Sequence, residues 1–386
     1  MKISKKAGQV ETSLTRQFFD IAKQFDDVID LTLGDPDVMP NIKIRQAACD
    51  AIMQGNTHYS SNAGIADLRK VLSKHIKNEY NQTVDYESEI MVSVGGMGAL
   101  YISVACLVDE GDEVIVLAPY YVNYIQMIKL AGGVPVVVNT SEENGFIPTK
   151  EQIENAITDK TVGIILNTPC NPTGVVLDDE ILDDIAKLAI KNDLTVISDE
   201  VYSYLIYENK KHSSIFTRDG MRERTVLIDS LSKRFSMTGY RAGYAVAPAE
   251  FIDCMTKMQE NISACTPLPS QYAGITAYEE CVADKSMLET FESRRNYIAN
   301  AINEIEGLSC KKPDSTFYLF VNIKESGLTS LEFAERLLKE QHVAVAPGIT
   351  YGENYDKFIR IAFTLEKEKL KQAVERISAF MKNIRV

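Results

Sequence analysis

The sequence predicts an α/β fold in which a large domain, built on a mostly parallel seven-stranded sheet sandwiched by helices, is joined to a smaller α+β domain. Seven short runs rich in β-branched residues recur between residues 89 and 247, and amphipathic helical patterns such as the one at 178–193 separate most of them. Near-continuous apolar strands with helical crossovers are typical of a parallel sheet covered on both faces. After residue 285 the alternation gives way to a mixture of strands and helices, which favours a second layer.

The expected elements follow in chain order. The sheet strands are expected at residues 89–94, 113–118, 134–138, 162–167, 194–198, 225–229 and 242–247. A helical region near 285–306 then leads to the strand pattern TFYLFVNI, a helix at 330–340, the strand patterns HVAVAP and FIRIAF, and a last helix at 366–382. The first 40 residues carry a helix-like stretch, Thr15–Phe25, and a Gly/Asp/Pro loop. We therefore expect an N-terminal arm at 1–42 that is part of the small domain, a large domain at 43–285 and a small C-terminal domain at 286–386.

Composition limits the partners. The 386-residue chain has a formal net charge of −13 and no cluster of basic residues, so it is poorly suited to nucleic-acid phosphates. No apolar run approaches the ~20 residues of a membrane-spanning helix, and the N-terminus lacks the apolar centre of a signal peptide. The seven cysteines are scattered without CxxC spacing, which fits a reducing compartment. We expect a cytoplasmic protein without a nucleic-acid or membrane partner.

The stretch DSLSKRFSMTGYRAGY places Lys233 directly after an expected strand, at the sheet edge where open α/β folds bind ligands. A lysine in such a position is often a solvated surface cation. Here Ser230 and Ser232 add hydroxyls, and Arg241 adds a second cation that can hold a phosphate and lower the lysine pKa. A neutral amine is what Schiff-base chemistry needs. The S-x-x-K pattern of acyl-serine enzymes is also present, but its S/Y-x-N and K-T-G partners are not.

A glycine-rich turn offers a place for an anion. In VSVGGMGALYISVACL a strand ends at Val94, four residues including Gly96 and Met97 form the turn, and a helix follows. The amides at the N-terminus of a helix attract anions. Such turns can also serve packing alone, and neither GxGxxG nor GxxxxGK[ST] is present, which disfavours dinucleotide and P-loop sites.

Polar residues also follow two further strands. Asn171 lies in ILNTPCNPTGV, and Asp199 and Tyr202 lie in VISDEVYSYL. Asp199 could cap a following helix, but a buried acid needs a cationic partner, and a protonated ring nitrogen would provide one. An amine, an acid and a phosphate cradle are together what pyridoxal phosphate requires. The four histidines are isolated, so we expect no metal site.

With these motifs in their order, the chain resembles the class I/II aminotransferases of the pyridoxal-phosphate-dependent transferase fold type I, in the subgroup of bacterial and archaeal aspartate and aromatic enzymes. The resemblance runs from VIDLTLGDPDVMP to FIRIAFTLEKEKL, and SLSKRFSMTGYRAG matches the cofactor-lysine motif. It implies that Lys233 binds the cofactor as a Schiff base and then moves a proton at the substrate α-carbon. It also implies that Asp199 pairs with the ring nitrogen.

Further roles are implied only by this resemblance. Asn171 and Tyr202 would hydrogen-bond the phenolic oxygen of the cofactor, and Tyr121 would stack on its ring. The phosphate would be held by Gly96, Met97, Ser230, Ser232, Arg241 and, across the interface of a homodimer, Tyr59 of the second subunit. The substrate carboxylate would be bound by Arg360, beside Asn171 and the backbone at Gly34.

Two departures from the family pattern stand out. Met97 replaces a lysine that aspartate-using members often carry to bind a distal carboxylate, which argues against strict dicarboxylate specificity. Ser315 and Thr316 stand where the family usually has Gly-Ala. The predicted function is transfer of an amino group from an aromatic amino acid, aspartate or a broader range of donors to a 2-oxo acid such as 2-oxoglutarate. The alternatives are a pyridoxal-phosphate-dependent C–S β-lyase and a non-enzymatic ligand-sensing relative.

Overall fold

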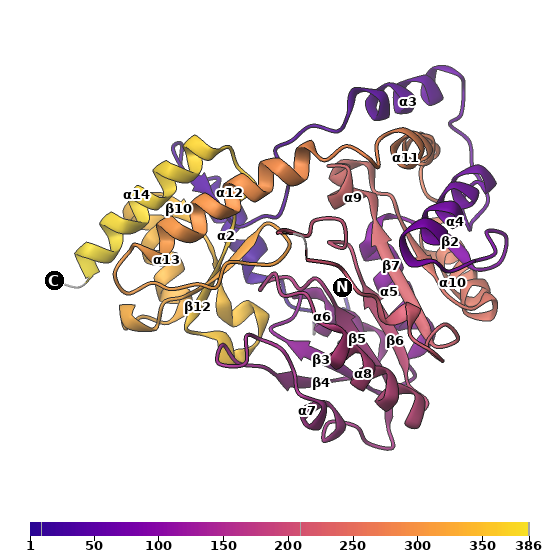
Figure 1. Ribbon diagram of the computed structural model, residues 1–386, viewed down its shortest axis with the longest axis horizontal. Helices are drawn as coiled ribbons and strands as arrows, with labels where there is room; N and C mark the ends of the chain where they lie inside the picture. Colours follow the sequence, from indigo (N-terminus) through magenta and orange to yellow (C-terminus); the bar gives the residue numbers. More distant parts are fainter. Residues whose placement is uncertain (9, 209, 385–386) are drawn as a thin grey trace.

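A seven-stranded sheet forms the centre of the larger part of the molecule (Figure 1). The computed structural model describes residues 1–8, 10–208 and 210–384. The strands lie in the order β2-β8-β7-β6-β5-β3-β4, with bounds Ile90–Ser93, Gly243–Val246, Thr225–Ser230, Thr195–Asp199, Thr161–Asn167, Glu113–Ala118 and Val134–Asn139. Strand β8 runs antiparallel to both β2 and β7, and the pairs from β7 to β4 are parallel. The predicted mostly parallel seven-stranded sheet is confirmed.

Helices cover both faces of this sheet because alternate strand residues are apolar on each side. Met91, Val116 and Ile165 pack in one core with residues of α5 (Gly95–Leu107), α6 (Asn123–Ala131) and α10 (Ala249–Ser263). On the other face, Val92 packs with α4 (Ala66–Tyr80) and α11 (Leu268–Glu280), and Ile164 packs with α8 (Asp179–Lys191). Helix α3 (Ile42–Met53) lies against α11 (Figure 1).

The C-terminal part is built on smaller sheets. Strands β11 (Ala346–Pro347), β12 (Phe358–Ala362) and β9 (Tyr318–Asn322) form an antiparallel sheet in that order. A second pair joins β1 (Ile29–Asp30) in parallel to β10 (Val343–Ala344). The longer helices of this region are α2 (Leu14–Ala22), α12 (Ser286–Asn303), α13 (Ser330–Gln341) and α14 (Lys367–Ile384). The shorter helices of the whole described chain are α1 (Lys5–Gly8), α7 (Lys150–Glu154), α9 (Leu231–Arg234), η1 (Ile215–Thr217), η2 (Thr238–Tyr240), η3 (Lys324–Ser326), η4 (Gly348–Tyr351) and η5 (Glu353–Tyr355).

The N-terminal segment packs on this C-terminal part. Phe18 and Ala22 of α2 and Ile29 of β1 belong to the same buried cluster as side chains of α12, α13 and α14. The helix predicted at Thr15–Phe25 thus exists as Leu14–Ala22 and packs on the smaller layer. The domain boundaries at residues 42 and 285 stay a prediction.

An aromatic cluster joins the two parts of the molecule. Phe320 and Tyr355 of the C-terminal part pack with Ala118, which ends β3. The Tyr355 hydroxyl accepts a hydrogen bond from Thr140 N at 3.1 Å and donates one to Thr140 O at 2.9 Å. None of the helices in the described residues has the length and apolar character needed to cross a membrane.

Candidate active site

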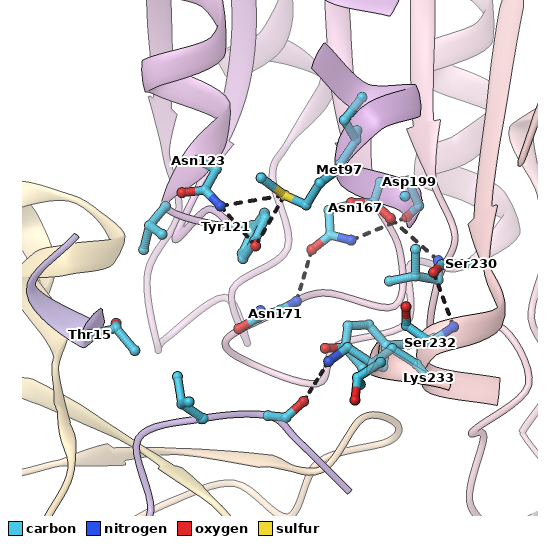
Figure 2. Close-up of a pocket in the computed structure, with 18 of the residues that line it drawn as sticks. Thr15, Met97, Tyr121, Asn123, Asn167, Asn171, Asp199, Ser230, Ser232 and Lys233 are labelled. Atoms are coloured by element: carbon cyan, nitrogen blue, oxygen red, sulfur yellow. Dashed lines mark hydrogen bonds between the residues drawn. The ribbon is translucent and has the colours of Figure 1, made fainter. Parts of the chain in front are cut away.

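A cavity of about 570 Å³ lies where the carboxyl ends of the sheet strands meet the C-terminal part (Figure 2). Its walls contain every predicted site residue except Tyr59, namely Gly34, Gly96, Met97, Tyr121, Asn171, Asp199, Tyr202, Ser230, Ser232, Lys233, Arg241 and Arg360. Tyr59 lies outside the cavity and is 88% exposed. One chain therefore brings together residues that are more than 300 positions apart in the sequence.

Lys233 lies in the short helix α9, which begins directly after β7, so the predicted loop is one helical turn at this point. Its Nζ atom donates a hydrogen bond to the carbonyl of Gly34 at 2.5 Å (Figure 2). Burial lowers the pKa of Lys233; Tyr318 and Asp35 partly oppose this effect, and the positive charges of Arg360 and Arg241 add to it. The cavity thus favours the neutral amine more than water does.

The N-terminus of α5 forms one wall of the cavity. The helix begins at Gly95, four residues earlier than the sequence suggested, and no side chain caps its first amides. Gly95 has φ +72°, and a Cβ atom there would lie 2.4 Å from Arg241 Nη2. A Cβ at Gly243 would lie 2.6 Å from the amide nitrogen of Gly96. Only glycine allows the arginine and the β8 backbone to approach the helix terminus this closely.

Asp199 is buried at the end of β6, and its closest partner is a hydroxyl. Tyr124 Oη donates to Asp199 Oδ2 at 2.6 Å. In the part of the chain that the structure describes, no Lys, Arg or His nitrogen lies within 4.0 Å of this carboxylate, and its pairing with a protonated ring nitrogen stays a prediction. Burial raises the pKa of Asp199 to about 6. The carboxylate is therefore available to a cation placed in the cavity.

Arg360 faces the same cavity from β12. Its Nη1 donates to Asn171 Oδ1 at 2.9 Å, and its Nη2 donates to the carbonyl of Thr32. The buried Nε atom has no hydrogen-bond partner among the described residues. Tyr318 and Tyr351 lie against the guanidinium, with ring centroids 4.2 and 5.2 Å from Cζ. A buried guanidinium without an acid partner is suited to bind a carboxylate.

A relay of amides connects this arginine to the strand ends. Asn171 N donates to Asn167 Oδ1 at 2.9 Å, and Asn167 Nδ2 donates to the carbonyl of Asp199 at 3.2 Å (Figure 2). Asn167 was not among the site residues predicted from the sequence, although it ends the strand before Asn171. Its position at a strand end was the available signal.

The comparisons with known proteins agree with this geometry. Residues 26–377 match the family model described as aminotransferase class I and II. The chain belongs to the class I and II aminotransferase family. It is 39% identical to an aspartate aminotransferase of Pyrococcus abyssi, with 99% of each chain covered. It is 37% identical to an aromatic-amino-acid aminotransferase of Thermococcus litoralis, again with 99% of each chain covered.

Solved structures of this family have the same fold. An aromatic aminotransferase from Pyrococcus horikoshii superimposes with a TM-score of 0.90 at 37% identity, covering 95% of this chain and 99% of that one. An aspartate aminotransferase from Thermus thermophilus, solved with maleate, has a TM-score of 0.93 at 33% identity, covering 98% and 99%. The fold and the aminotransferase class predicted from the sequence are confirmed.

The far wall of the cavity in this aminotransferase carries Met97. Tyr121 Oη and Asn123 Nδ2 point at its sulfur, at 3.4 and 3.5 Å, and Asn123 Nδ2 also donates to Tyr121 Oη at 2.9 Å (Figure 2). A thioether is a weak acceptor and carries no charge. Arg16 and Thr15 of α2 also reach the wall, and neither was predicted from the sequence. Arg16 Nε is 3.5 Å from Asp20 on the exposed face of α2.

The segment of this aminotransferase that departs from the family's Gly-Ala pattern leads directly into the site. Thr316 has φ +67°, which is rare for a β-branched residue. Its carbonyl accepts a hydrogen bond from Tyr207 Oη at 2.5 Å, and its Oγ1 accepts one from the amide of Tyr318 at 3.3 Å. Tyr318 lines the cavity and was not selected from the sequence.

Proposed function

We propose that this aminotransferase uses pyridoxal phosphate to move an amino group between an L-amino acid and a 2-oxo acid in two half-reactions. One observation carries the proposal: an amine with a lowered pKa, a buried acid that forms no ion pair with any described residue and an uncapped helix terminus all face one cavity. These groups come from three different elements, α9, β6 and α5. Their chemistry fits the aldehyde, the ring nitrogen and the phosphate of the cofactor.

The residues that line the cavity divide among the parts of this cofactor. The uncapped amides at Gly96 and Met97 suit a phosphate, and Ser230, Ser232 and Arg241 add donors around it. Asp199 suits the ring nitrogen, Asn171 and Tyr202 suit the phenolic oxygen, and Tyr121 suits the ring face. When bound, pyridoxal phosphate supplies an aldehyde that takes up the amine and a ring that withdraws electrons from the α-carbon.

The remaining steps belong to side chains of this chain. Arg360 binds the substrate carboxylate with the free Nε and its fork, and the Gly34 backbone lies beside it. Lys233 would take the proton from the substrate α-carbon and give it to the carbon that carried the aldehyde of the cofactor, on the other side of the shared nitrogen, and its lowered pKa is suited to this role. Asp199, ionised against a cation, holds the ring nitrogen in its protonated form.

For the substrate we propose aspartate or an aromatic amino acid as donor, with 2-oxoglutarate as an expected acceptor. The relatives are named for both donors. The neutral wall of Met97, Tyr121 and Asn123 favours an aromatic or broad range over strict dicarboxylate use, because the hydrogen bonds among these three described residues offer a distal carboxylate no positive charge. Arg16, which lines the cavity from α2, could bind the distal carboxylate of a longer dicarboxylic substrate.

We also propose a homodimer in which Tyr59 of each subunit reaches the phosphate site of the other. Tyr59 is exposed, and neighbouring apolar side chains of the α3 region, Met39, Ile42, Ile52 and Met53, are exposed as well. Exposed apolar side chains gathered in one region are typical of an interaction surface. The cytoplasmic location stays a prediction from the cysteine spacing.

Absorption of the purified protein tests the cofactor and the reaction together. We expect a near-visible band that disappears when a donor amino acid is added alone and returns with a 2-oxo acid. Lys233→Ala should slow this half-reaction at least about 1,000-fold, because a positioned proton carrier contributes that much, while exposed Lys257→Ala leaves the rate unchanged. Continuous release of pyruvate and ammonia from an amino acid alone would instead identify a β-lyase. Absence of the band would refute the proposal.

A further inference from the structure

Tyr318 is a buried side chain that contacts three residues of the proposed site. Its hydroxyl lies 3.1 Å from the hydroxyl of Tyr202. The same hydroxyl touches the backbone of Gly34, where a Cβ atom would come within 1.7 Å of it. Its ring lies 4.2 Å from the guanidinium of Arg360. One buried side chain thus meets the proposed cofactor side and the proposed substrate side of the cavity.

The surroundings hold Tyr318 in a fixed position. It is the first residue of β9, paired with Ala362 of β12, and it is only 3% exposed. The Thr316 hydroxyl accepts its amide hydrogen, and the ring of Phe317 lies against both Tyr318 and Tyr202. A side chain supported by a sheet and by packed aromatic rings can orient other groups without moving itself.

The two hydroxyls form a hydrogen-bonded pair in which only one of them is the donor. A tyrosine hydroxyl has a single proton and also accepts hydrogen bonds. If Tyr318 donates to Tyr202, the proton of Tyr202 is free to point into the cavity. A hydroxyl that accepts one hydrogen bond also becomes a better donor of the next.

We propose that Tyr318 is a positioning residue with two separable roles: its hydroxyl aims the Tyr202 proton at the phenolic oxygen of the cofactor, and its ring fixes Arg360 for the substrate carboxylate. The inference rests on the proposed function. The hydroxyl stabilises the deprotonated phenolic oxygen through Tyr202, so it affects the titration of the bound cofactor. The ring acts through a cation–π contact, so it affects substrate binding.

Two substitutions separate the roles. Tyr318→Phe removes the hydroxyl and keeps the ring. We expect it to raise the pH midpoint of the near-visible absorption change by about 0.5 to 1 unit, the size of one lost hydrogen bond, and to leave KM within about twofold. Tyr318→Leu removes both groups. We expect the same shift together with a KM for the amino acid that is about five- to tenfold higher.

Tyr278→Phe is the matched control, because Tyr278 is buried among His75, Phe235 and Tyr244 and does not line the cavity. It should leave both the midpoint and KM unchanged. A midpoint in Tyr318→Phe that is equal to or below that of the wild type would overturn the hydroxyl role. A KM in Tyr318→Leu equal to that of Tyr318→Phe would overturn the ring role.

A measurement without cofactor checks the hydroxyl pair. Each single variant, Tyr202→Phe or Tyr318→Phe, removes the same hydrogen bond between the two hydroxyls. In the cofactor-free protein the sum of their two decreases in Tm should therefore exceed the decrease in Tm of the double variant. Fully additive losses would contradict the pair. A wild-type protein without any near-visible band would refute the proposed function. A normal band with an unshifted Tyr318→Phe titration would refute only the role of the Tyr318 hydroxyl.

Discussion

Asp199 and Arg360 are buried ionisable groups on opposite walls of one cavity, and their surroundings affect their charged forms differently. Neither has a partner of opposite charge within 4.0 Å among the described residues. Burial raises the pKa of Asp199 to about 6, so this group can give up its charge. Burial opposes the charge of Arg360 as well, but Tyr351 and Tyr318 more than offset it and raise its pKa.

The difference indicates how each wall meets its ligand. The carboxyl of Asp199 accepts hydrogen bonds from Tyr124 Oη at 2.6 Å and from the amide of Val201 at 3.4 Å, and a cation beside it would lower its pKa and favour the ionised form. Arg360 stays charged in every state, because an arginine is not deprotonated in proteins, and two acceptors and two aromatic rings hold it in place. The acid therefore adapts to its ligand, and the arginine is prepared in advance for its ligand.

The largest effect is expected from a change to Arg360, which is charged and held in place before its ligand binds. Arg360→Lys keeps one positive charge but loses the planar fork, and it leaves either Asn171 Oδ1 or the Thr32 carbonyl without its donor. We expect KM for the amino acid to rise about 100-fold, with cofactor affinity unchanged within about threefold. Steady-state kinetics and a cofactor titration measure both. Arg376→Lys, beside Asp27 on the surface, is the control. Equal losses in both affinities would contradict the separation of the two walls.

The raised pKa of Asp199 is tested by measuring stability at different pH values. The folded pKa of Asp199, about 6, lies above its ordinary value of 3.8. Its stabilising contribution is therefore present below pH 3.8 and is lost as pH rises through 6. In the cofactor-free protein, Asp199→Asn should gain about 2 kcal/mol relative to wild type between pH 4.5 and pH 8. Urea unfolding at both pH values measures this gain, and the same measurement on exposed Asp67→Asn is the control. A constant difference would show that Asp199 is ionised at no cost.

A smaller effect is expected where the backbone, and not a buried charge, forms the site. Gly95→Ala places a Cβ 2.4 Å from Arg241 at φ +72°. We expect cofactor affinity to fall about 10- to 30-fold, because the helix terminus and the arginine must separate. Gly98→Ala is the matched control in the same helix, since its Cβ would meet nothing closer than 3.6 Å. Equal affinity in the two variants would contradict the cradle.

The smallest effect concerns the one predicted residue outside the cavity. Tyr59→Phe should weaken cofactor binding about tenfold by removing one hydrogen bond to a charged oxygen. Mixing inactive Lys233→Ala subunits with Tyr59→Phe subunits should restore one site of wild-type affinity in each mixed dimer. Equilibrium titration of the mixture measures this fraction. A monomeric protein with unchanged affinity would contradict the shared site.

The sequence was sufficient to predict that the polar residues at the strand ends lie close together. Parallel strands bring their carboxyl ends to one edge of the sheet, and this does not depend on the conformation of the loops. Lys233 and Asp199 were found in this way, and Arg241 was selected as a second cation in the same stretch as Lys233. The resemblance supplied Arg360. By contrast, Tyr124 reaches Asp199 from a neighbouring helix, and no local pattern records a contact across 75 residues.

The same reason explains the other omissions. Tyr318 stands in an ordinary apolar strand pattern, and only the packing of β9 beside β12 places its hydroxyl against Tyr202 and Gly34. The start of α5 at Gly95 was missed because two glycines in succession are typical of a turn, whereas here they allow the approach of Arg241 and β8.

The aromatic cluster around Phe320 and Tyr355 has a consequence for the independence of the two parts. Separating the chain near residue 285 would leave one fragment with Phe320, Tyr355 and Phe358 uncovered, and the other with Ala118 and Phe146 uncovered. The hydrogen bonds of Tyr355 to Thr140 would be lost as well. After a single proteolytic cut at that place the two fragments should stay together through gel filtration, because each covers the other's apolar surface.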